Sequence, residues 1–202
     1  KNQDKIVEIV ENAIGLMDEE GHWQYQFPLE INGEVVEKGW TSALSQSLGA
    51  MGMIRAGEYL GDTTLKKYAE KAMQFSAQDG PLVHIFNGWK IFRHHSGNNP
   101  SCVLSSHLYS LMAISDLTEV MGTKKWKKIL DSVILDTEAI LPLYDTGYSS
   151  HYDLSHILSD LPSKSATPQY HCTHAMQLSW LSNKISSDRI SEIAKIWGSY
   201  IF

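Results

Sequence analysis

Apolar residues recur at the three- and four-residue spacing of an α-helix in seven stretches of this chain. Residues that end helices separate these stretches, such as Gly61, Gly122 and the run Asp79-Gly80-Pro81. The predicted helices cover residues 4–17, 40–60, 65–75, 101–121, 124–140, 171–184 and 188–200. They favour a mainly α fold in a single domain over residues 1–202. Helix pairs of this kind can stack into a curved solenoid or a toroid, with the loops gathered at one end.

Two Asn-Gly pairs predict short β-hairpins between the helices. Asn32-Gly33 suits a type I′ turn, in which both central residues take positive φ angles, and Asn87-Gly88 repeats the signal within residues 82–92. In residues 23–27, three aromatic side chains alternate with glutamines. That alternation has the period of a strand, so we expect one there as well.

The charge balance argues against one large class of function. The chain has 202 residues, with 17 Lys and Arg against 23 Asp and Glu, which gives a formal net charge of −6. A general nucleic-acid binder shows a basic stripe, so we expect no nucleic-acid partner. No apolar run reaches the roughly 18 residues that a membrane-spanning helix needs, so we expect no such span.

The cysteines and histidines match no strong metal signature. Cys102 and Cys172 are too few for a disulfide framework, and the sequence leaves open whether they pair. His171 and His174 can share one helix face, but neither an HExxH motif nor paired CxxC motifs occur. We therefore predict no metal site.

One segment concentrates the residues that could carry chemistry. Residues 141–169 form the longest stretch without a clear helix, and they are rich in Tyr, His, Ser and Asp. Four of the nine Tyr and four of the nine His lie within residues 144–174. A loop of this length in a compact domain is usually functional or disordered, and this composition favours an ordered, functional loop.

Three blocks in this chain resemble the C-terminal domain of the D-glucuronyl C5-epimerase family. The first is the string LPLYDTG (141–147), YDLSH (152–156) and YHCTH (170–174), followed by Gln177-Leu178. The second is GWTSALSQ (39–46) with MIRA (53–56), which is similar to the family's GW-x-SA-x-x-Q…RA helix. The third is residues 100–111 with its Leu-Tyr-Ser-Leu run. The blocks keep the family's order over roughly residues 23–200, and the first is the most specific.

The resemblance implies a fold and a reaction. The fold would be an α/α toroid, here an incomplete α/α barrel of about seven helices, because 202 residues are short for a ring of six helix pairs. The reaction would invert C5 of glucuronate residues within a polysaccharide of the heparan type, without an organic cofactor. The family's proton transfers are attributed to tyrosines, and its motifs place two of them at Tyr152 and Tyr170. We also expect an extracytoplasmic location, and a homodimer is left open.

Two departures from the family pattern change the expected site. Ser155 stands where the family has an arginine, and a gap-free count places His94 and His95 where the family has a Glu-Tyr pair. Our hypothesis is that His95 serves as base or acid on one side of the sugar, while the two tyrosines work on the other. The predicted catalytic residues are Tyr152, Tyr170 and His95, and the predicted substrate-binding residues are Trp40, Gln46, Arg93, His94, His156, His171 and His174.

Other readings of the same residues stay open. Removing H5 of a uronate makes an enediolate-like carbanion that can also expel its 4-O substituent, as in a polysaccharide lyase. Without the family's arginine, tyrosine and acid, the domain could instead bind a glycan without turning it over. A glycoside hydrolase would need paired carboxylates, for which Asp145 and Asp153 are the candidates in the cluster. The net charge of −6 favours a uronate polymer with few sulfates.

Overall fold

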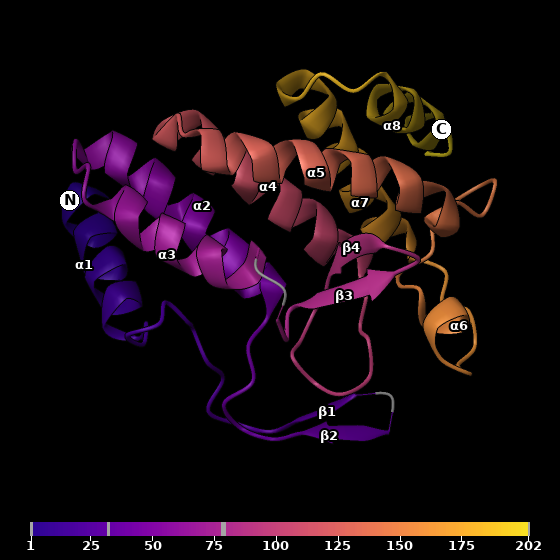
Figure 1. The fold of residues 1–202 in the computed structure, drawn as a ribbon, viewed down its shortest axis with the longest axis horizontal. Helices are drawn as coiled ribbons and strands as arrows, with labels where there is room; N and C mark the ends of the chain where they lie inside the picture. The colour runs from indigo at the N-terminus through magenta and orange to yellow at the C-terminus, as the bar shows by residue number, and fades with distance from the viewer. Residues whose placement is uncertain (1, 32, 78–79, 202) are drawn as a thin grey trace.

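The computed structural model describes residues 2–31, 33–77 and 80–201. Within these residues the fold is mainly helical with two short antiparallel hairpins, as predicted (Figure 1). Each of the seven predicted stretches contains a long helix, and two single-turn helices lie between the fifth and sixth of them. The long helices are α1 (Asn2–Gly15), α2 (Ala43–Leu60), α3 (Leu65–Ala77), α4 (Leu104–Met121), α5 (Lys124–Ile140), α7 (Pro168–Lys184) and α8 (Asp188–Ser199), and the single turns are η1 (Leu141–Tyr144) and α6 (Ser155–Leu158).

Short polar side chains and glycines set where several helices begin and end. Thr123, Thr167 and Ser187 each accept a hydrogen bond from the backbone N–H three residues later, which satisfies a donor that the helix start leaves unpaired. Gly61 and Gly122 end α2 and α4 in the left-handed conformation, with φ of 70° and 60°. The chain therefore reverses after each of these two helices.

The helices form two layers. Helix α4 packs against α2 on one side and α7 on the other, and α3, α5 and α8 each pack on the inner helix that precedes them in the chain. Inner and outer helices differ in how much they bury: α4 buries twelve of its 18 residues, whereas α5 buries five of its 17, at the spacing of one helix face. The inner layer therefore forms the centre of the core.

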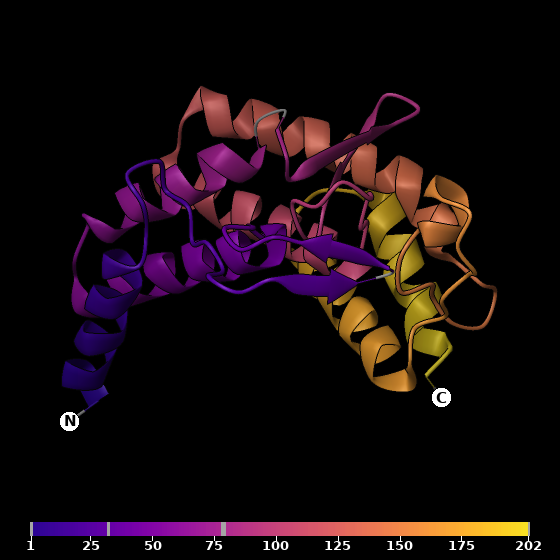
Figure 2. The same cartoon turned by 90° about the horizontal axis from the view of Figure 1, so that it is seen from below.

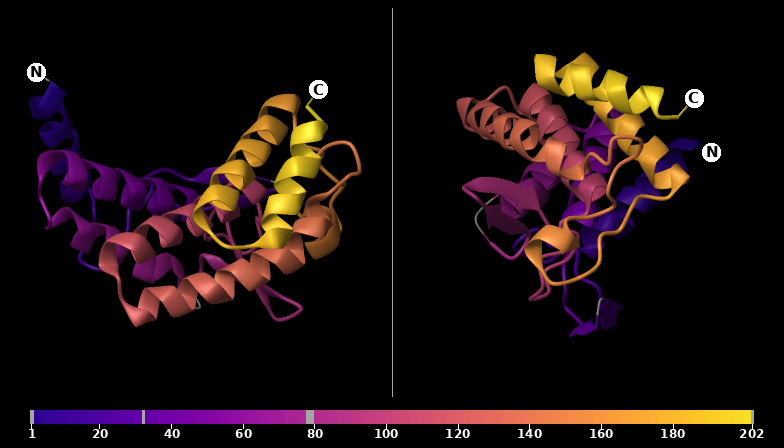
Figure 3. Two further views of the ribbon diagram at one scale, coloured as in Figure 1. Left: turned by 90° about the horizontal axis from the view of Figure 1, so that it is seen from above. Right: turned by 90° about the vertical axis from the view of Figure 1, so that its right-hand side faces the viewer.

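The two layers follow an open arc (Figure 2). Helix α1 lies at one end of the arc and the α7–α8 pair at the other (Figure 3). The described helices thus pair and curve as expected, while closure into a toroid stays a prediction. Among the described residues, no helix is both long enough and apolar enough to cross a membrane.

Both predicted hairpins form. Strand β1 (Leu29–Ile31) pairs with β2 (Glu34–Val36), and β3 (Val83–Phe86) pairs with β4 (Trp89–Phe92). Asn87 and Gly88 have φ of 50° and 87°, the positive values that an Asn-Gly turn allows. In the first hairpin Gly33 has φ of 76°, whereas Asn32 lies outside the described residues, as does the predicted helix terminator Asp79.

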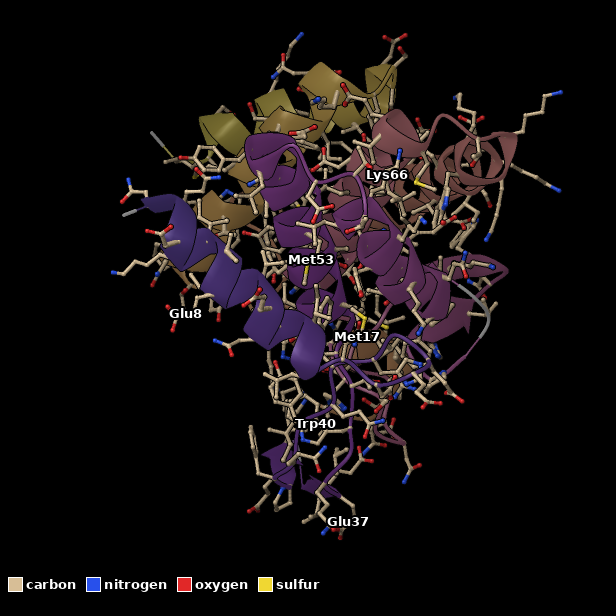
Figure 4. All side chains as sticks on the ribbon, turned by 90° about the vertical axis from the view of Figure 1, so that its left-hand side faces the viewer. Glu8, Met17, Glu37, Trp40, Met53 and Lys66 are labelled. Carbon is tan, nitrogen blue, oxygen red and sulfur yellow. The ribbon has the colours of Figure 1, made fainter. Side chains whose placement is uncertain are left out.

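The predicted strand over residues 23–27 is wrong. These residues form only isolated bridges, one of them from Tyr25 to Trp40. Two of the three alternating aromatics pack on other elements instead of pairing in a sheet. The Trp23 indole donates to the Ala13 carbonyl at 2.7 Å, and the Tyr25 ring stacks on Trp40, whereas Phe27 is exposed. In Figure 4, Trp40 lies between the helices and the β1–β2 hairpin. The segment is therefore a packed connection from α1 to the first hairpin.

Glycine at position 49 lets this connection approach α2. A Cβ atom built on Gly49 would lie 2.3 Å from the nearest atom of the Trp23 ring, whereas one on Gly52 would meet nothing within 4 Å. We predict that Gly49→Ala lowers the free energy of unfolding by about 1–3 kcal/mol, because the ring must move. Gly52→Ala is the matched control and should be neutral or stabilising by up to about 1 kcal/mol. Urea unfolding measures both, and equal effects would contradict the close approach.

A buried histidine ties the second hairpin to the core. His107 on α4 is fully buried, and its Nδ1 accepts from the backbone N–H of Phe92 at 3.2 Å. Nε2 therefore carries the proton and donates to Thr137 Oγ1 on α5 at 2.9 Å. Burial lowers the pKa of His107 to about 3. A neutral imidazole thus joins β4, α4 and α5, and it fixes the strand from which the histidine loop at residues 93–100 departs.

Candidate active site

The long loop over residues 141–169 is held by hydrogen bonds between its two arms. The N–H of Tyr152 donates to the carbonyl of Lys164 at 2.7 Å, and that of Ala166 donates to the carbonyl of Ser150 at 2.8 Å. The arms therefore run antiparallel. The loop therefore has a defined backbone arrangement between η1 and α7.

The same loop docks on the start of α4. The N–H of Leu104 donates to the carbonyl of Tyr152 at 3.1 Å. Below it, the fully buried Tyr144 donates its hydroxyl to the Cys102 carbonyl at 2.8 Å. Tyr144 therefore anchors the loop in the core, and its phenol is not accessible to a ligand. Tyr152, by contrast, is only half-buried.

Two tyrosines meet where the loop reaches α7. The rings of Tyr152 and Tyr170 lie 4.8 Å apart between centroids, edge to face at 73°, and their side chains are hydrogen-bonded. Tyr170 lies in the first turn of α7, where Thr167 caps the helix. Tyr152 is half-buried and Tyr170 is 41% exposed, so a ligand can reach the pair. The structure thus brings the two predicted catalytic tyrosines together.

The surroundings of Tyr152 keep its phenol protonated. Burial raises the pKa of Tyr152 to about 12, and the neighbouring Tyr170 and the Asp153 carboxylate act in the same direction. At neutral pH this phenol is a proton donor. A cation near Tyr152 would be needed to make it a base.

A buried carboxylate and a lysine flank the pair. Asp153 is 3% exposed, accepts from the backbone N–H of Ser155 at 2.9 Å, and lies 3.9 Å from the Lys164 ammonium. Ser155 is itself buried and brings no charge. Sequence reasoning missed Lys164, although it is the single Lys or Arg between Lys128 and Lys184.

Behind the pair, Ser150 joins two buried histidines. Its hydroxyl lies 3.0 Å from His171 Nδ1 and 2.8 Å from His174 Nδ1. The Trp197 carbonyl, 3.2 Å from His171 Nε2, can only accept, so that nitrogen carries a proton. In the neutral form of His171, Ser150 donates to His171 and accepts from His174. Burial, with a smaller contribution from His171, lowers the pKa of His174 to about 3.

The hydrogen bonds to Ser150 give His171 and His174 a structural role. His171 follows Tyr170 on α7, and Ser150 precedes Tyr152 by two residues in the loop. Both imidazoles are buried, so the predicted contact of His171 and His174 with substrate is not supported by their exposure. They instead fasten the loop to α7 directly behind the tyrosine pair. Nothing in the sequence motif alone identifies Ser150 as the link.

The guanidinium of Arg93 is occupied by main-chain carbonyls of its own loop and of the segment before β3. It donates to the carbonyls of Pro81 at 3.0 Å and Asn99 at 2.8 Å, and also to that of Gly97. Burial lowers the pKa of Arg93, although the side chain remains charged at neutral pH. The predicted substrate contact of Arg93 therefore competes with three carbonyls that shape the loop.

The adjacent histidines face different neighbours. His94 Nδ1 lies 2.8 Å from Ser106 Oγ, in the first turn of α4. His95 is 1% exposed, and its Nδ1 accepts from the backbone N–H of Gly97 at 3.1 Å, which leaves the proton on Nε2. Burial lowers the pKa of His94, and it lowers that of His95 to about 4 with help from His94. Both rings are neutral at neutral pH, and His94 shares the start of α4 with the tyrosine loop.

Two residues of the GW-x-SA-x-x-Q block, Trp40 and Gln46, make packing and main-chain contacts within the fold. Trp40 stacks on Tyr25 at 3.9 Å between centroids and donates from its indole to the Phe27 carbonyl at 2.8 Å. Gln46 is fully buried, and its amide pairs with the main chain of residues 21–23. Both predicted substrate contacts therefore hold the connection from α1 against α2.

His156 lies on the other side of the loop. Its ring centroid is 4.4 Å from that of His151, whose Nδ1 lies 3.1 Å from Ser163 Oγ. Burial, with a smaller effect from His156, lowers the pKa of His151. The side-chain Nδ1 of His156 is buried and has no hydrogen-bond partner. His156, in α6, therefore lies against His151 of the arm that carries Tyr152.

The two aspartates of the cluster bind main-chain N–H groups. Asp145 accepts from the N–H of Gly147 at 2.7 Å and from the Tyr200 hydroxyl at 3.3 Å. Asp153 accepts from the N–H of Ser155, the first residue of α6. These contacts are those of capping residues, and they do not favour the paired carboxylates of a glycoside hydrolase.

The described residues contain no group of three or more His, Cys, Asp or Glu side chains placed to hold a metal ion. The two cysteines are free thiols. Cys102 is buried, and burial raises its pKa to about 12, whereas Cys172 is half-buried on α7. The disulfide that the sequence left open is therefore not formed.

The chain matches known proteins over most of its length. A family model described as D-glucuronyl C5-epimerase C-terminus matches residues 17–199. A D-glucuronyl C5-epimerase of Caenorhabditis elegans is 28% identical over 183 residues, which cover 83% of this chain and 30% of that protein. The aligned part is thus less than a third of the relative. Since the family match covers most of the chain, this protein belongs to the family of the D-glucuronyl C5-epimerase C-terminus.

Proposed function

We propose that this domain moves the C5 proton of uronate residues in a polysaccharide, as a C5-epimerase. The observation that carries the proposal is the hydrogen-bonded Tyr152–Tyr170 pair, which is open to solvent. A buried carboxylate and an ammonium flank it. Membership in the epimerase family supports the same reaction.

The chemistry needs two proton-transfer groups on opposite faces of the sugar. When the C5–H bond breaks, its electron pair moves into the adjacent carboxylate and forms an enediolate, and the base takes the proton. Tyr152, protonated at neutral pH, returns a proton to C5 from the other face, with Tyr170 hydrogen-bonded to it. Solvent then restores both groups. This assignment makes the tyrosines the acid side and requires a base elsewhere.

We propose a neutral imidazole of the His94–His95 pair as that base. Both histidines have lowered pKa values, so each is unprotonated at neutral pH. The Nδ1 lone pair of His95 accepts from Gly97, whereas His94 contacts Ser106 at the start of α4, where the tyrosine loop also docks. The geometry therefore favours His94 over the His95 that the sequence suggested.

The test is incubation of a heparosan-type polymer with the protein in deuterated water. We expect deuterium at C5 and the appearance of iduronate signals in the NMR spectrum. An unsaturated uronate with new ultraviolet absorbance would instead show β-elimination. Calorimetric binding without deuterium incorporation would show a glycan-binding module. A polymer with few sulfates is the first choice, because the chain has a net charge of −6.

A further inference from the structure

We infer that Glu34, on the β1–β2 hairpin, is a positioning residue that holds the histidine loop at residues 93–100 in place for proton removal from C5. The inference rests on the proposed function, in which an imidazole of this loop is the base. Glu34 acts through the loop and does not itself transfer the proton. Three observations carry the inference: two hydrogen bonds from the loop to the carboxylate, a close approach at Gly97, and the contacts that join the histidine loop to the tyrosine loop.

The register of the hairpin turns Glu34 towards the rest of the molecule. Glu34 pairs with Ile31, and Val35 pairs with Glu30, so Glu34 and Val36 lie on one face of the hairpin and Glu30 and Val35 on the other. Val36 is 8% exposed, whereas Val35 is 58% exposed. The face that carries Glu34 is therefore the one that packs. In Figure 1, the loop that follows β4 descends towards this hairpin.

The carboxylate of Glu34 binds the far end of the histidine loop. Its two oxygens accept from the backbone N–H groups of Asn98 at 2.5 Å and Asn99 at 3.1 Å. Burial acts to raise the pKa of Glu34, but these two hydrogen bonds, together with His95 and Arg93, outweigh it and lower the pKa. Glu34 is therefore a carboxylate at neutral pH, and both hydrogen bonds are charge-assisted.

Glycine at position 97 lets the hairpin approach the loop. A Cβ atom built on Gly97 would lie 2.8 Å from Val36 Cγ2, 2.8 Å from His95 Nδ1 and 3.0 Å from Glu34 Oε1. Two of these three neighbours belong to the hairpin. Its docking on the loop therefore depends on the carboxylate at position 34 and on the lack of a side chain at position 97.

Arg93 binds the same end of the loop through its carbonyl groups. The guanidinium donates to the carbonyls of Gly97 and Asn99. Asn99 is thus held at its N–H by Glu34 and at its carbonyl by Arg93. A negative and a positive side chain therefore fix the main chain of the loop together.

The two ends of the histidine loop meet beside the tyrosine loop. The N–H of His94 donates to the Ser101 carbonyl at 2.6 Å. Just after Ser101, Val103 forms an antiparallel bridge with Asp153, and the N–H of Leu104 donates to the Tyr152 carbonyl at 3.1 Å. Residues 101–104 therefore bind both loops. A shift of the histidine loop on this segment moves the imidazole relative to the tyrosine pair, and proton transfer depends on that geometry.

The experiment compares four variants of the whole protein with the wild type. Glu34→Ala removes the carboxylate, and Glu34→Gln keeps one carbonyl oxygen that can accept. Gly97→Ala keeps the carboxylate but obstructs the docking. Glu30→Ala is the matched control, because it removes the same charge from the opposite, exposed face of the hairpin.

Three quantities are measured for each protein. NMR follows C5 deuterium exchange in a heparosan-type polymer at several polymer concentrations, which separates the maximal rate from KM. Calorimetry measures the affinity for the same polymer. Amide hydrogen exchange reports the N–H groups of Asn98 and Asn99 directly, whether or not the protein turns over its substrate.

We expect Glu34→Ala to lower the maximal rate of C5 exchange about tenfold or more, because a small displacement of a catalytic group costs a large factor in rate. KM and polymer affinity should stay within about twofold, since the carboxylate is bound to the loop rather than to the sugar. Gly97→Ala should give the same split, Glu34→Gln a smaller loss, and Glu30→Ala the rate of the wild type. The two amide protons should exchange about tenfold faster in Glu34→Ala.

An unchanged maximal rate in Glu34→Ala overturns the inference. A lower rate that comes with an equal loss of polymer affinity overturns it too, because Glu34 would then act on binding rather than on the base. The proposed function fails separately, if the wild type binds the polymer but exchanges no deuterium at C5. In that case the catalytic role of Glu34 falls with it, while the two amide protons still show that the carboxylate holds the loop.

Discussion

Tyr152→Phe is expected to lower the formation of iduronate by about 10²–10⁴-fold, because it removes the hydroxyl that donates to C5 from the face opposite the base. The phenylalanine keeps the ring that packs edge to face on Tyr170. The half-buried pocket around it also keeps its shape, so the unfolding midpoint should change little. The measurement is the initial rate at which iduronate signals appear in a heparosan-type polymer, followed by NMR.

Two further variants make this result specific. Tyr170→Phe should also lower the formation of iduronate, since it removes the hydrogen-bond partner of the Tyr152 phenol. Tyr148→Phe is the control, because this tyrosine lies in the same loop and is 71% exposed. Undiminished formation of iduronate by Tyr152→Phe would contradict the assignment, whatever the other two variants do.

Acidification is expected to destabilise the fold steeply, and His107 is the clearest cause. Its pKa is about 3 in the folded protein and about 6.5 in the unfolded chain, so between these values the unfolded state binds more protons. Stability is therefore full above pH 6.5, falls as the pH drops below it, and the loss is complete near pH 3. Each such proton contributes a slope of about 1.4 kcal/mol per pH unit.

His107→Gln tests whether His107 takes up this proton. The quantity compared is the slope of the unfolding free energy against pH, not the stability at one pH. Glutamine can accept from Phe92 and donate to Thr137 but does not titrate. Between pH 6 and pH 4, the free energy of urea unfolding should fall less steeply in the variant, by about 1.4 kcal/mol per pH unit. His84→Gln, at a half-buried strand position, should change the slope less. An unchanged slope in His107→Gln would show that His107 is not the group that takes up the proton.

The seven long helices could be predicted because apolar residues recur at helical spacing in each of the seven stretches. The two Asn-Gly pairs predicted both hairpins. The strand over residues 23–27 could not be read correctly, because alternating aromatics look alike whether they face a partner strand or pack on helices. Their pattern reports burial, and the indole of Trp23 is buried by Ala13 and Gly49 rather than by a sheet.

The family motifs predicted Tyr152 and Tyr170 as the candidate catalytic residues, but they did not predict which side chains surround the pair. The Tyr152 N–H meets the Lys164 carbonyl only because the two arms of the loop pair in one register, and that pairing joins residues 12 or more positions apart in the chain. In the same way, Arg93 and Gln46 look like polar ligands in the sequence. Their hydrogen bonds to nearby main chain are visible only once the loops are folded.

The most direct test of the account is the C5 deuterium content of a heparosan-type polymer after incubation with the wild-type protein in deuterated water. The account predicts deuterium at C5 of both glucuronate and newly formed iduronate, without unsaturated uronate. A polymer that the protein binds, yet that keeps its hydrogen at C5, would contradict it.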